Sequence, residues 1–263
     1  MAARSVWSGS ISFAVLSIPC KLYTATESKD VAFHQLHAEC NSRIKQKKWC
    51  PVDNREITMD EIVKGYEWAK DQYVLVTEQD MDDLPVPAKK VIGLQAFVDL
   101  DQVDSTYVEK AYWLEPEAIG AKPYALLLQA MKTRKVAAVA TIALRTKERI
   151  CSLRPSADGS VIVLETLFWP DELRTMGKPP EVTMTAPELA MAEMLIDTLH
   201  EPFTPENYKD QYRESLLNMI DAKRTGQVIE VIPVAEPAPA PDLMAALRAS
   251  IESAKTTRKA QVA

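Results

Sequence analysis

Apolar and polar residues alternate differently in the two halves of the chain. In the first half, short apolar runs are bounded by glycine, proline or polar residues, a pattern typical of strands. Two such runs lie between Val6 and Tyr23, interrupted by Gly9 and Pro19. Further strands are predicted over residues 73–76, 91–98, 110–114, 136–145, 149–153 and 161–168. Asp158 and Gly159 predict a hairpin turn between the last two.

Helical signals become dominant after residue 184. Residues 77–84 and 123–133 predict two helices among the strands. The sequence Thr185-Ala-Pro-Glu188 is a capping box that starts a helix through residue 199, and Thr204-Pro205 predicts the start of a second helix ending near Gly226. Strands followed by helices indicate an α+β chain with a β-barrel or sandwich core and a helical C-terminal arm.

The last segment differs in composition from the rest. Residues 233–241 read PVAEPAPAP, a linker that is expected to be extended. Beyond it, Asp242 caps a predicted helix whose apolar stripe contains Leu243, Leu247 and Ile251. Such a helix is either a docking peptide for another protein or a weakly ordered tail. We therefore divide the chain into a core (1–184), a helical arm (185–232) and a linker with a tail (233–263).

Composition indicates a soluble protein with a substantial core. The chain has 263 residues, of which 47% are hydrophobic, and its formal net charge is -6. No apolar run approaches the roughly 18 to 20 residues that a membrane span requires, and no secretion signal is recognisable at the start. We therefore expect a cytoplasmic protein without a membrane partner. Its four cysteines, Cys20, Cys40, Cys50 and Cys151, are expected to be reduced.

Positive charge is concentrated in two stretches of this acidic chain. Residues 131–154 carry a formal charge of +6, whereas residues 71–120 carry -8 and residues 155–221 carry -9. A second basic stretch covers residues 43–48. Clustered charge is common on solvated faces, but it is also what a phosphate backbone requires.

Each basic stretch contains three cations that are spaced two residues apart. They are Arg43, Lys45 and Lys47 in the first stretch and Arg145, Lys147 and Arg149 in the second. In extended chain each trio would project on one side in steps of about 6.8 Å, near the phosphate spacing of a nucleic-acid strand. Because the sequence has no motif for reading bases, this spacing favours a binder of a nucleic-acid duplex that is indifferent to sequence.

The sequence supports metal binding and catalysis less than it supports nucleic-acid binding. His34, His37, Cys40 and Cys50 are candidate zinc ligands, but Asp53 stands where a CxxC motif would place its second cysteine. The sequence contains no phosphate loop, GxGxxG, GxSxG or HExxH motif, so we expect neither an enzyme nor a cofactor. Two alternatives stay open: a zinc-containing nucleic-acid-binding regulatory module, and a hydrolase that uses Cys40 or Cys50 with a histidine.

Five motifs follow one another in the order found in bacterial Ku proteins, which this chain resembles along nearly its whole length. They are WSGSISFAVLSIPCKLYTATE, FHQLHAECNSRIKQKKWCP, EIVKGYEW, ALLLQAMKTRKVAAVATIALRTKER and LFWPDELR. The resemblance implies a homodimer in which two Ku-type β-barrel cores, joined by bridging segments, form a ring around duplex DNA threaded from a broken end. It also implies a non-catalytic role in the repair of double-strand breaks by non-homologous end joining, in the bacterial nucleoid. Asp53 departs from family members that have a cysteine in that region.

Carried over to this sequence, the resemblance implies roles for individual residues. The helices after Thr185 would form the dimer. The tail, with Leu243, Leu247 and Ile251, would recruit the ATP-dependent DNA ligase of end joining, ligase D. The residues expected to face DNA are Arg43, Lys45, Lys47, Lys48, Lys64, Arg134, Arg145, Lys147 and Arg149.

Overall fold

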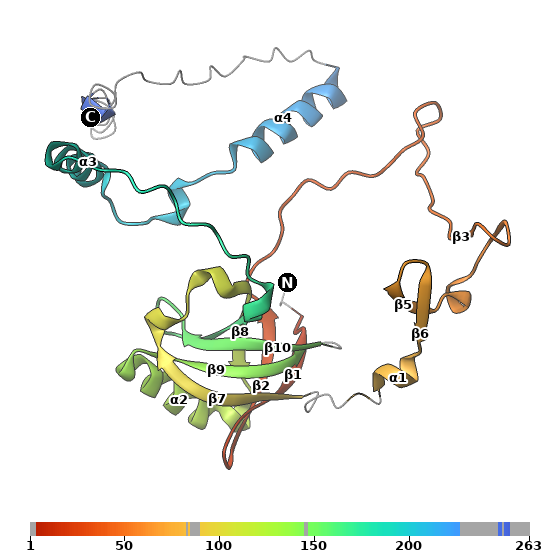
Figure 1. The fold of residues 1–263 in the computed structure, drawn as a ribbon, viewed down its shortest axis with the longest axis horizontal. Helices are drawn as coiled ribbons and strands as arrows, with labels where there is room; N and C mark the ends of the chain where they lie inside the picture. The colour runs from red at the N-terminus through yellow and green to blue at the C-terminus, as the bar shows by residue number, and fades with distance from the viewer. Residues whose placement is uncertain are drawn as a thin grey trace. The chain divides into compact units, whose positions relative to one another are not determined.

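The computed structural model describes residues 4–82, 84, 90–144, 147–226, 247–248 and 250–252. The chain divides into two compact units. The first consists of residues 1–29 and 33–175, and the second of residues 30–32 and 176–263. Figure 1 shows the elements of both units, which are described separately below.

A closed seven-stranded barrel forms the centre of the first unit (Figure 1). Its strands are β1 (Trp7–Phe13), β2 (Leu16–Thr24), β7 (Val91–Asp99), β8 (Val108–Pro116), β9 (Val136–Leu144), β10 (Lys147–Pro155) and β11 (Ile162–Leu167). They follow one another around the barrel in the order β1, β2, β8, β11, β10, β9 and β7. All neighbours are antiparallel except β1 and β7, whose short parallel pairing closes the barrel. The predicted α+β fold with a barrel core is therefore confirmed.

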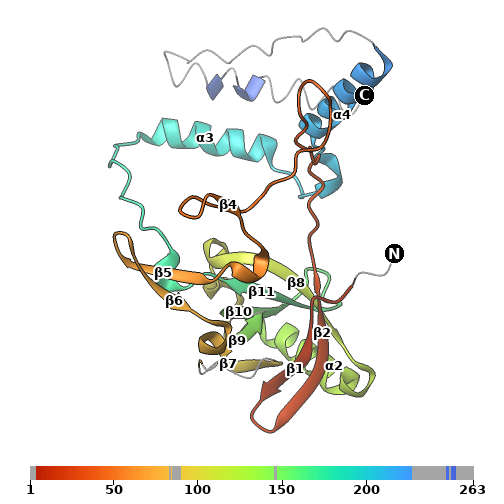
Figure 2. The same ribbon diagram turned by 90° about the vertical axis from the view of Figure 1, so that its right-hand side faces the viewer.

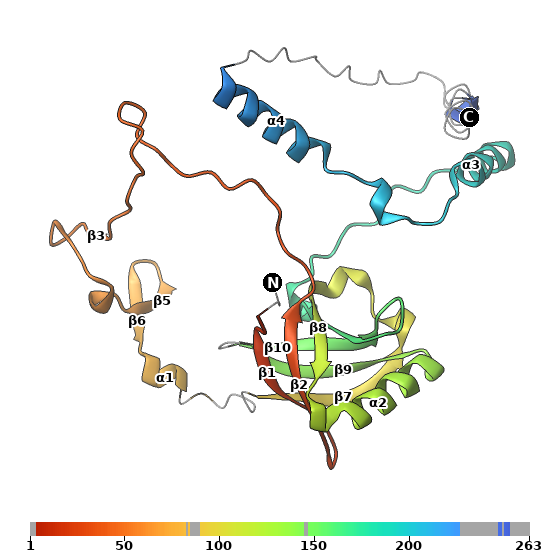
Figure 3. The same cartoon turned by 180° about the vertical axis from the view of Figure 1, so that it is seen from behind.

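The hydrophobic core fills the barrel and extends to helix α2 (Ala121–Arg134). Every residue of β11 is buried, as expected for a strand that is covered on both faces. On α2 the buried side chains are Tyr124, Leu128 and Met131, which are spaced four and three residues apart and so lie on one face. This face packs against the barrel, where α2 contacts β2, β9 and β10 (Figure 3).

Tyr124 joins α2 to two barrel strands. Its hydroxyl donates a hydrogen bond of 2.6 Å to the Leu114 carbonyl oxygen on β8 and accepts one of 2.7 Å from the Ile162 amide on β11. Burial raises the pKa of Tyr124, so the hydroxyl keeps the proton that it donates. One side chain thereby satisfies two backbone groups in the buried core.

Replacing Tyr124 by phenylalanine removes both hydrogen bonds and keeps the ring. Two buried backbone groups are left without this partner, so we expect Tyr124→Phe to lower the free energy of unfolding by about 2 kcal/mol. Thermal or urea unfolding measures the change. Tyr212, which is 77% exposed, supplies the control, because Tyr212→Phe should leave stability unchanged. Equal stability of both variants would contradict the bridging role of Tyr124.

The predicted turn between β10 and β11 is confirmed. Gly159 has a φ of 69°, in the left-handed region that favours glycine. The Asp158 carboxylate accepts hydrogen bonds from the Ser156 hydroxyl at 2.5 Å and the Ser160 amide at 3.1 Å. These bonds lower the pKa of Asp158 to about 2, so the carboxylate is ionised at neutral pH.

Between β2 and β7 the chain forms two small hairpins. The first pairs β3 (Trp49–Cys50) with β4 (Arg55–Glu56), and the second pairs β5 (Lys64–Ala69) with β6 (Gln72–Val76) before the short helix α1 (Glu78–Asp82) (Figure 2). The hydrophobic pattern predicts only β6 and α1. The sequence KGYEWA of β5 does not read as a strand because glycine and charged residues interrupt it.

The second unit contains the two longer helices of the C-terminal half. Helix α3 (Ala186–Leu199) begins with the predicted capping box, in which the Thr185 amide donates to the Glu188 carboxylate at 2.7 Å. The predicted start of the next helix is wrong: Pro205–Asn207 is a single 3-10 turn, and α4 (Gln211–Thr225) is capped by Asp210. Its predicted end is confirmed, since Gly226 is the C-cap with a φ of 75°.

Only part of the predicted tail helix falls within the described residues. Leu243 lies outside them, whereas Leu247 and Ile251 lie in helical residues, and Ile251 is buried. In the part of the chain that the structure describes, no helix is both long enough and apolar enough to span a membrane.

Candidate nucleic-acid interface

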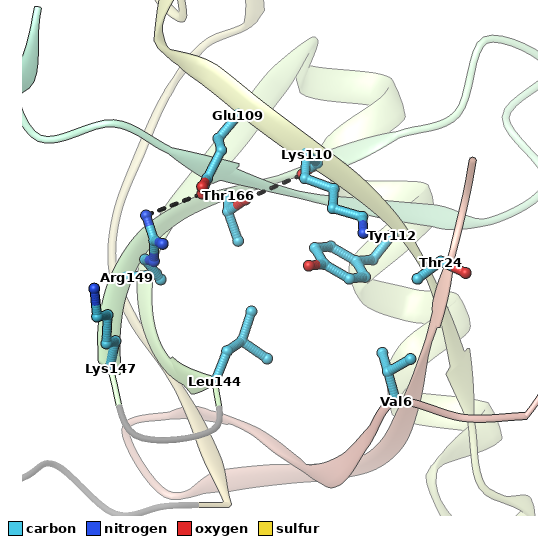
Figure 4. Close-up of a pocket in the computed structure, with 9 residues that line it drawn as sticks. All are labelled: Val6, Thr24, Glu109, Lys110, Tyr112, Leu144, Lys147, Arg149 and Thr166. Atoms are coloured by element: carbon cyan, nitrogen blue, oxygen red, sulfur yellow. Dashed lines mark hydrogen bonds and ion pairs between the residues drawn. The ribbon is translucent and has the colours of Figure 1, made fainter. Parts of the chain in front are cut away.

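A cavity of about 550 Å³ opens at one end of the barrel (Figure 4). The antiparallel strand order gathers the first residues of β8 and β10 with the last residues of β2, β9 and β11 at this end. The lining residues are Val6, Thr24, Glu109, Lys110, Tyr112, Leu144, Lys147, Arg149 and Thr166. Two of the nine, Lys147 and Arg149, were expected from the sequence to face DNA.

Strand β10 supplies the cationic wall of this cavity. Lys147 and Arg149 are two residues apart on a strand, so both side chains project from the same face, as the spacing predicts. Lys147 is exposed, whereas Arg149 is half-buried and its Nη1 lies 3.0 Å from Glu109 Oε2 on β8. The third member of the predicted trio, Arg145, lies outside the described residues.

Strand β8, which is separated from β10 by β11, contributes residues that the sequence did not single out. Lys110 Nζ lies 5.7 Å from the centre of the Tyr112 ring, and the backbone oxygen of Lys110 accepts a hydrogen bond of 3.3 Å from the Thr166 hydroxyl (Figure 4). Strand β11 lies between β8 and β10, which places Glu109 within reach of Arg149. No spacing in the sequence reports this strand order, so the pairing could not be predicted.

The charge of the cavity is opposite to that of the whole chain. Three cations and one carboxylate line it, which gives a formal charge of +2 in a chain of net charge -6. A concave site with low-dielectric walls concentrates the electrostatic potential, and this attracts anions. Phosphate groups fit this chemistry, because guanidinium and ammonium groups bind phosphate oxygens without reading base identity.

The other predicted basic trio does not lie on a strand. Arg43 makes an isolated β-bridge with Leu36, and the residues from 44 to 48 belong to no strand. Lys45 and Lys48 are exposed, and Lys47 Nζ lies 2.6 Å from Glu56 Oε2 on β4. The cations of this stretch are therefore accessible to a phosphate backbone, although they are not arranged on a named strand.

The two remaining cations have different surroundings. Lys64 is exposed at the first residue of β5. Arg134 is exposed in the last turn of α2, where a cation also stabilises the negative end of the helix dipole. Its position is therefore explained without any contact with DNA.

The candidate zinc ligands are only partly brought together. His37 Nδ1 lies 3.1 Å from Cys40 Sγ, which also lies 2.9 Å from the Ser42 hydroxyl. The hydrogen bond with Ser42 lowers the pKa of the Cys40 thiol. Within the described ranges, no group of three or more His, Cys, Asp or Glu side chains is arranged to hold a metal ion. The geometry therefore gives no support to the zinc-containing module.

Comparison with known proteins gives one consistent family. The sequence profile of the Ku70/Ku80 beta-barrel domain matches residues 12–194. The non-homologous end joining protein Ku of Symbiobacterium thermophilum is 42% identical over 98% of this chain, which spans 65% of that relative's length. The Ku protein of Desulfitobacterium hafniense is 40% identical over 98% of this chain and 90% of its own length. That of Heliobacterium modesticaldum is 40% identical over 100% of this chain and 96% of its own length. The SPOC domain of human PHD-finger protein 3 is 13% identical and aligns with 62% of this chain and 95% of its own, with a TM-score of 0.31. That score is too low to carry an argument, but the matching profile and the similar relatives together place the chain in the Ku β-barrel family.

Proposed function

We propose that this chain binds the ends of double-stranded DNA independently of sequence, as a homodimeric ring, and acts in the repair of double-strand breaks by non-homologous end joining. The ring would protect the ends. It would recruit an ATP-dependent DNA ligase, ligase D, through the tail that contains Leu243, Leu247 and Ile251. The chain itself would catalyse no reaction, and the ligase would join the strands.

One observation carries this proposal: the match to proteins named for non-homologous end joining extends over nearly the whole chain and nearly the whole of the Desulfitobacterium and Heliobacterium relatives. The cationic wall of the barrel cavity agrees with it. Lys147 and Arg149 present charge that can bind phosphate oxygens whatever the bases are, which suits a protein that must bind breaks of any sequence.

Exposed apolar residues support self-association. In the β5–β6 hairpin, Tyr66, Trp68 and Tyr73 are 68%, 62% and 59% exposed. A two-stranded hairpin is marginally stable by itself, and several exposed large apolar side chains mark an interaction surface. A second copy of the chain is the occupant that a homodimeric ring requires. Helices α3 and α4 would contribute to the same dimer.

Competition between DNA duplexes of unrelated sequence tests this function. Blunt duplexes of equal length and different base composition should compete for the protein equally, because backbone contacts do not depend on the bases. Bound protein should also protect both ends from an exonuclease. A preference for one sequence, or digestion at the same rate with and without protein, would contradict the proposal.

A further inference from the structure

The lining of the barrel cavity combines cationic and apolar side chains. Lys147 and Arg149 form a cationic wall, and Tyr112, Leu144 and Val6 contribute ring and aliphatic surface (Figure 4). The backbone contacts proposed above use only cations, so they give no role to an aromatic ring and two aliphatic side chains in the same concavity. A ligand that fits both kinds of surface must have an anionic part and a flat apolar part.

We propose that this cavity binds a single unpaired nucleotide, with its phosphate at Lys147 and Arg149 and its base against the Tyr112 ring. The unpaired terminal nucleotide of a DNA overhang is the source that we favour, and this part rests on the proposed binding of DNA ends. A free nucleotide offers the same chemistry, and the experiment below separates the two sources.

The size of the cavity agrees with this ligand. A volume of about 550 Å³ lies within the range of about 300–1,000 Å³ that is usual for small-molecule sites, which often occupy the mouths of β-barrels. A duplex is too wide to enter such a space and would only lay its backbone across the opening, at Lys147 and Arg149, whereas one extruded or overhanging nucleotide can enter. The cavity therefore selects for a nucleotide outside the helical stack.

The cationic part of the lining, Lys147 and Arg149, can accept a phosphate. The ion pair between Arg149 Nη1 and Glu109 Oε2 at 3.0 Å holds the half-buried guanidinium in place, and a guanidinium has five N–H donors in all. Glu109 opposes anion binding, but the formal charge of the lining remains +2. Lys147 is exposed two residues away on the same strand, so it can approach the same phosphate.

The apolar part of the lining can accept a base. Tyr112 packs against the barrel core, so its ring is held by neighbouring side chains. Lys110 Nζ lies over one face of the ring, 5.7 Å from its centre, in a cation–π contact that a base stacking on this face would displace. Bases of every kind stack on aromatic rings, so this contact would preserve indifference to sequence.

Binding of three DNA ends to the full chain tests the proposal. The duplexes share one sequence and carry a blunt end, a two-nucleotide 3′ overhang or a two-nucleotide 5′ overhang. We expect at least one overhang to bind about tenfold more tightly than the blunt end, as one stacked base predicts. Tyr112→Leu should remove this preference, whereas Tyr112→Phe, which keeps the ring, should retain it.

Different failures point to different parts of the account. If all three ends bind equally, both in the unmodified chain and in Tyr112→Leu, and 2′-deoxyadenosine 5′-monophosphate does not bind, the nucleotide site is overturned while end binding stands. If overhangs give no preference but the monophosphate binds and Tyr112→Leu abolishes its binding, the site takes a free nucleotide. If no duplex binds at all, the proposed function fails. Calorimetric titration with the monophosphate then tests the nucleotide site by itself. Monophosphate binding that is lost in Tyr112→Leu would support the site, and absence of monophosphate binding to the unmodified chain would overturn it.

Discussion

Neutralising the second basic trio should weaken binding to every DNA end by about 100-fold at physiological salt. The variant is Arg145→Gln with Lys147→Gln and Arg149→Gln. Each lost phosphate contact is expected to reduce the slope of log K against log salt by roughly 0.9, so the slope should fall by about 3. Fluorescence anisotropy with labelled duplexes at several salt concentrations measures both quantities.

A control for this variant removes the same charge elsewhere. Lys122, Lys178 and Lys209 are exposed and lie outside both basic stretches, so replacing all three by glutamine changes the net charge equally. We expect this control to bind nearly as the unmodified chain does. Equal losses of DNA affinity in the two variants would show that only net charge matters. A change in sequence preference in the trio variant would contradict the assignment of Lys147 and Arg149 to phosphate contacts.

Adding one methyl group at Gly9 should destabilise the barrel severely. A Cβ atom there would lie 2.3 Å from the Lys90 backbone oxygen and 2.4 Å from the Trp7 ring. The same Lys90 oxygen accepts a hydrogen bond of 3.0 Å from the Ser10 amide, beside the parallel pairing that closes the barrel. Because a backbone oxygen cannot move aside cheaply, we expect Gly9→Ala to lower the free energy of unfolding by about 3 kcal/mol.

Gly93 provides a matched control on the neighbouring strand. A Cβ atom there would meet only the Thr141 hydroxyl, at an ordinary distance of 3.7 Å. Thermal unfolding of Gly93→Ala should therefore resemble that of the unmodified chain, while Gly9→Ala unfolds at a markedly lower temperature. Similar melting temperatures for the two variants would contradict the close approach of Lys90 to β1.

The barrel could be predicted largely from local patterns, because its strands are apolar runs that end at recognisable turns. The β10–β11 hairpin shows this well, since Asp158 and Gly159 mark its turn in the sequence and in the structure. The hydrophobic pattern does not predict β5, because glycine and charged residues interrupt its apolar positions. The strand forms through its pairing with β6 in the hairpin. The start of α4 was misplaced because Thr204-Pro205 caps only one 3-10 turn.

The candidate site was predictable only along single strands. The spacing of Lys147 and Arg149 predicts that they share a face, and they line one cavity. Glu109 and Tyr112 come from β8, which is separated from β10 in the barrel by β11. Contacts between residues of these two strands depend on the order of the strands around the barrel. Local sequence patterns do not reveal that order. The first basic trio shows the opposite case, where regular spacing is not accompanied by a strand.

Comparison of linear and circular DNA of the same sequence tests the central claim most directly, because a closed ring can thread only onto an end. We expect the protein to bind a linear duplex and not a covalently closed circle, and a single restriction cut in that circle should restore binding. Measuring at two salt concentrations separates this topological effect from nonspecific attraction to phosphate. Equal binding of the linear and the closed DNA would contradict the ring.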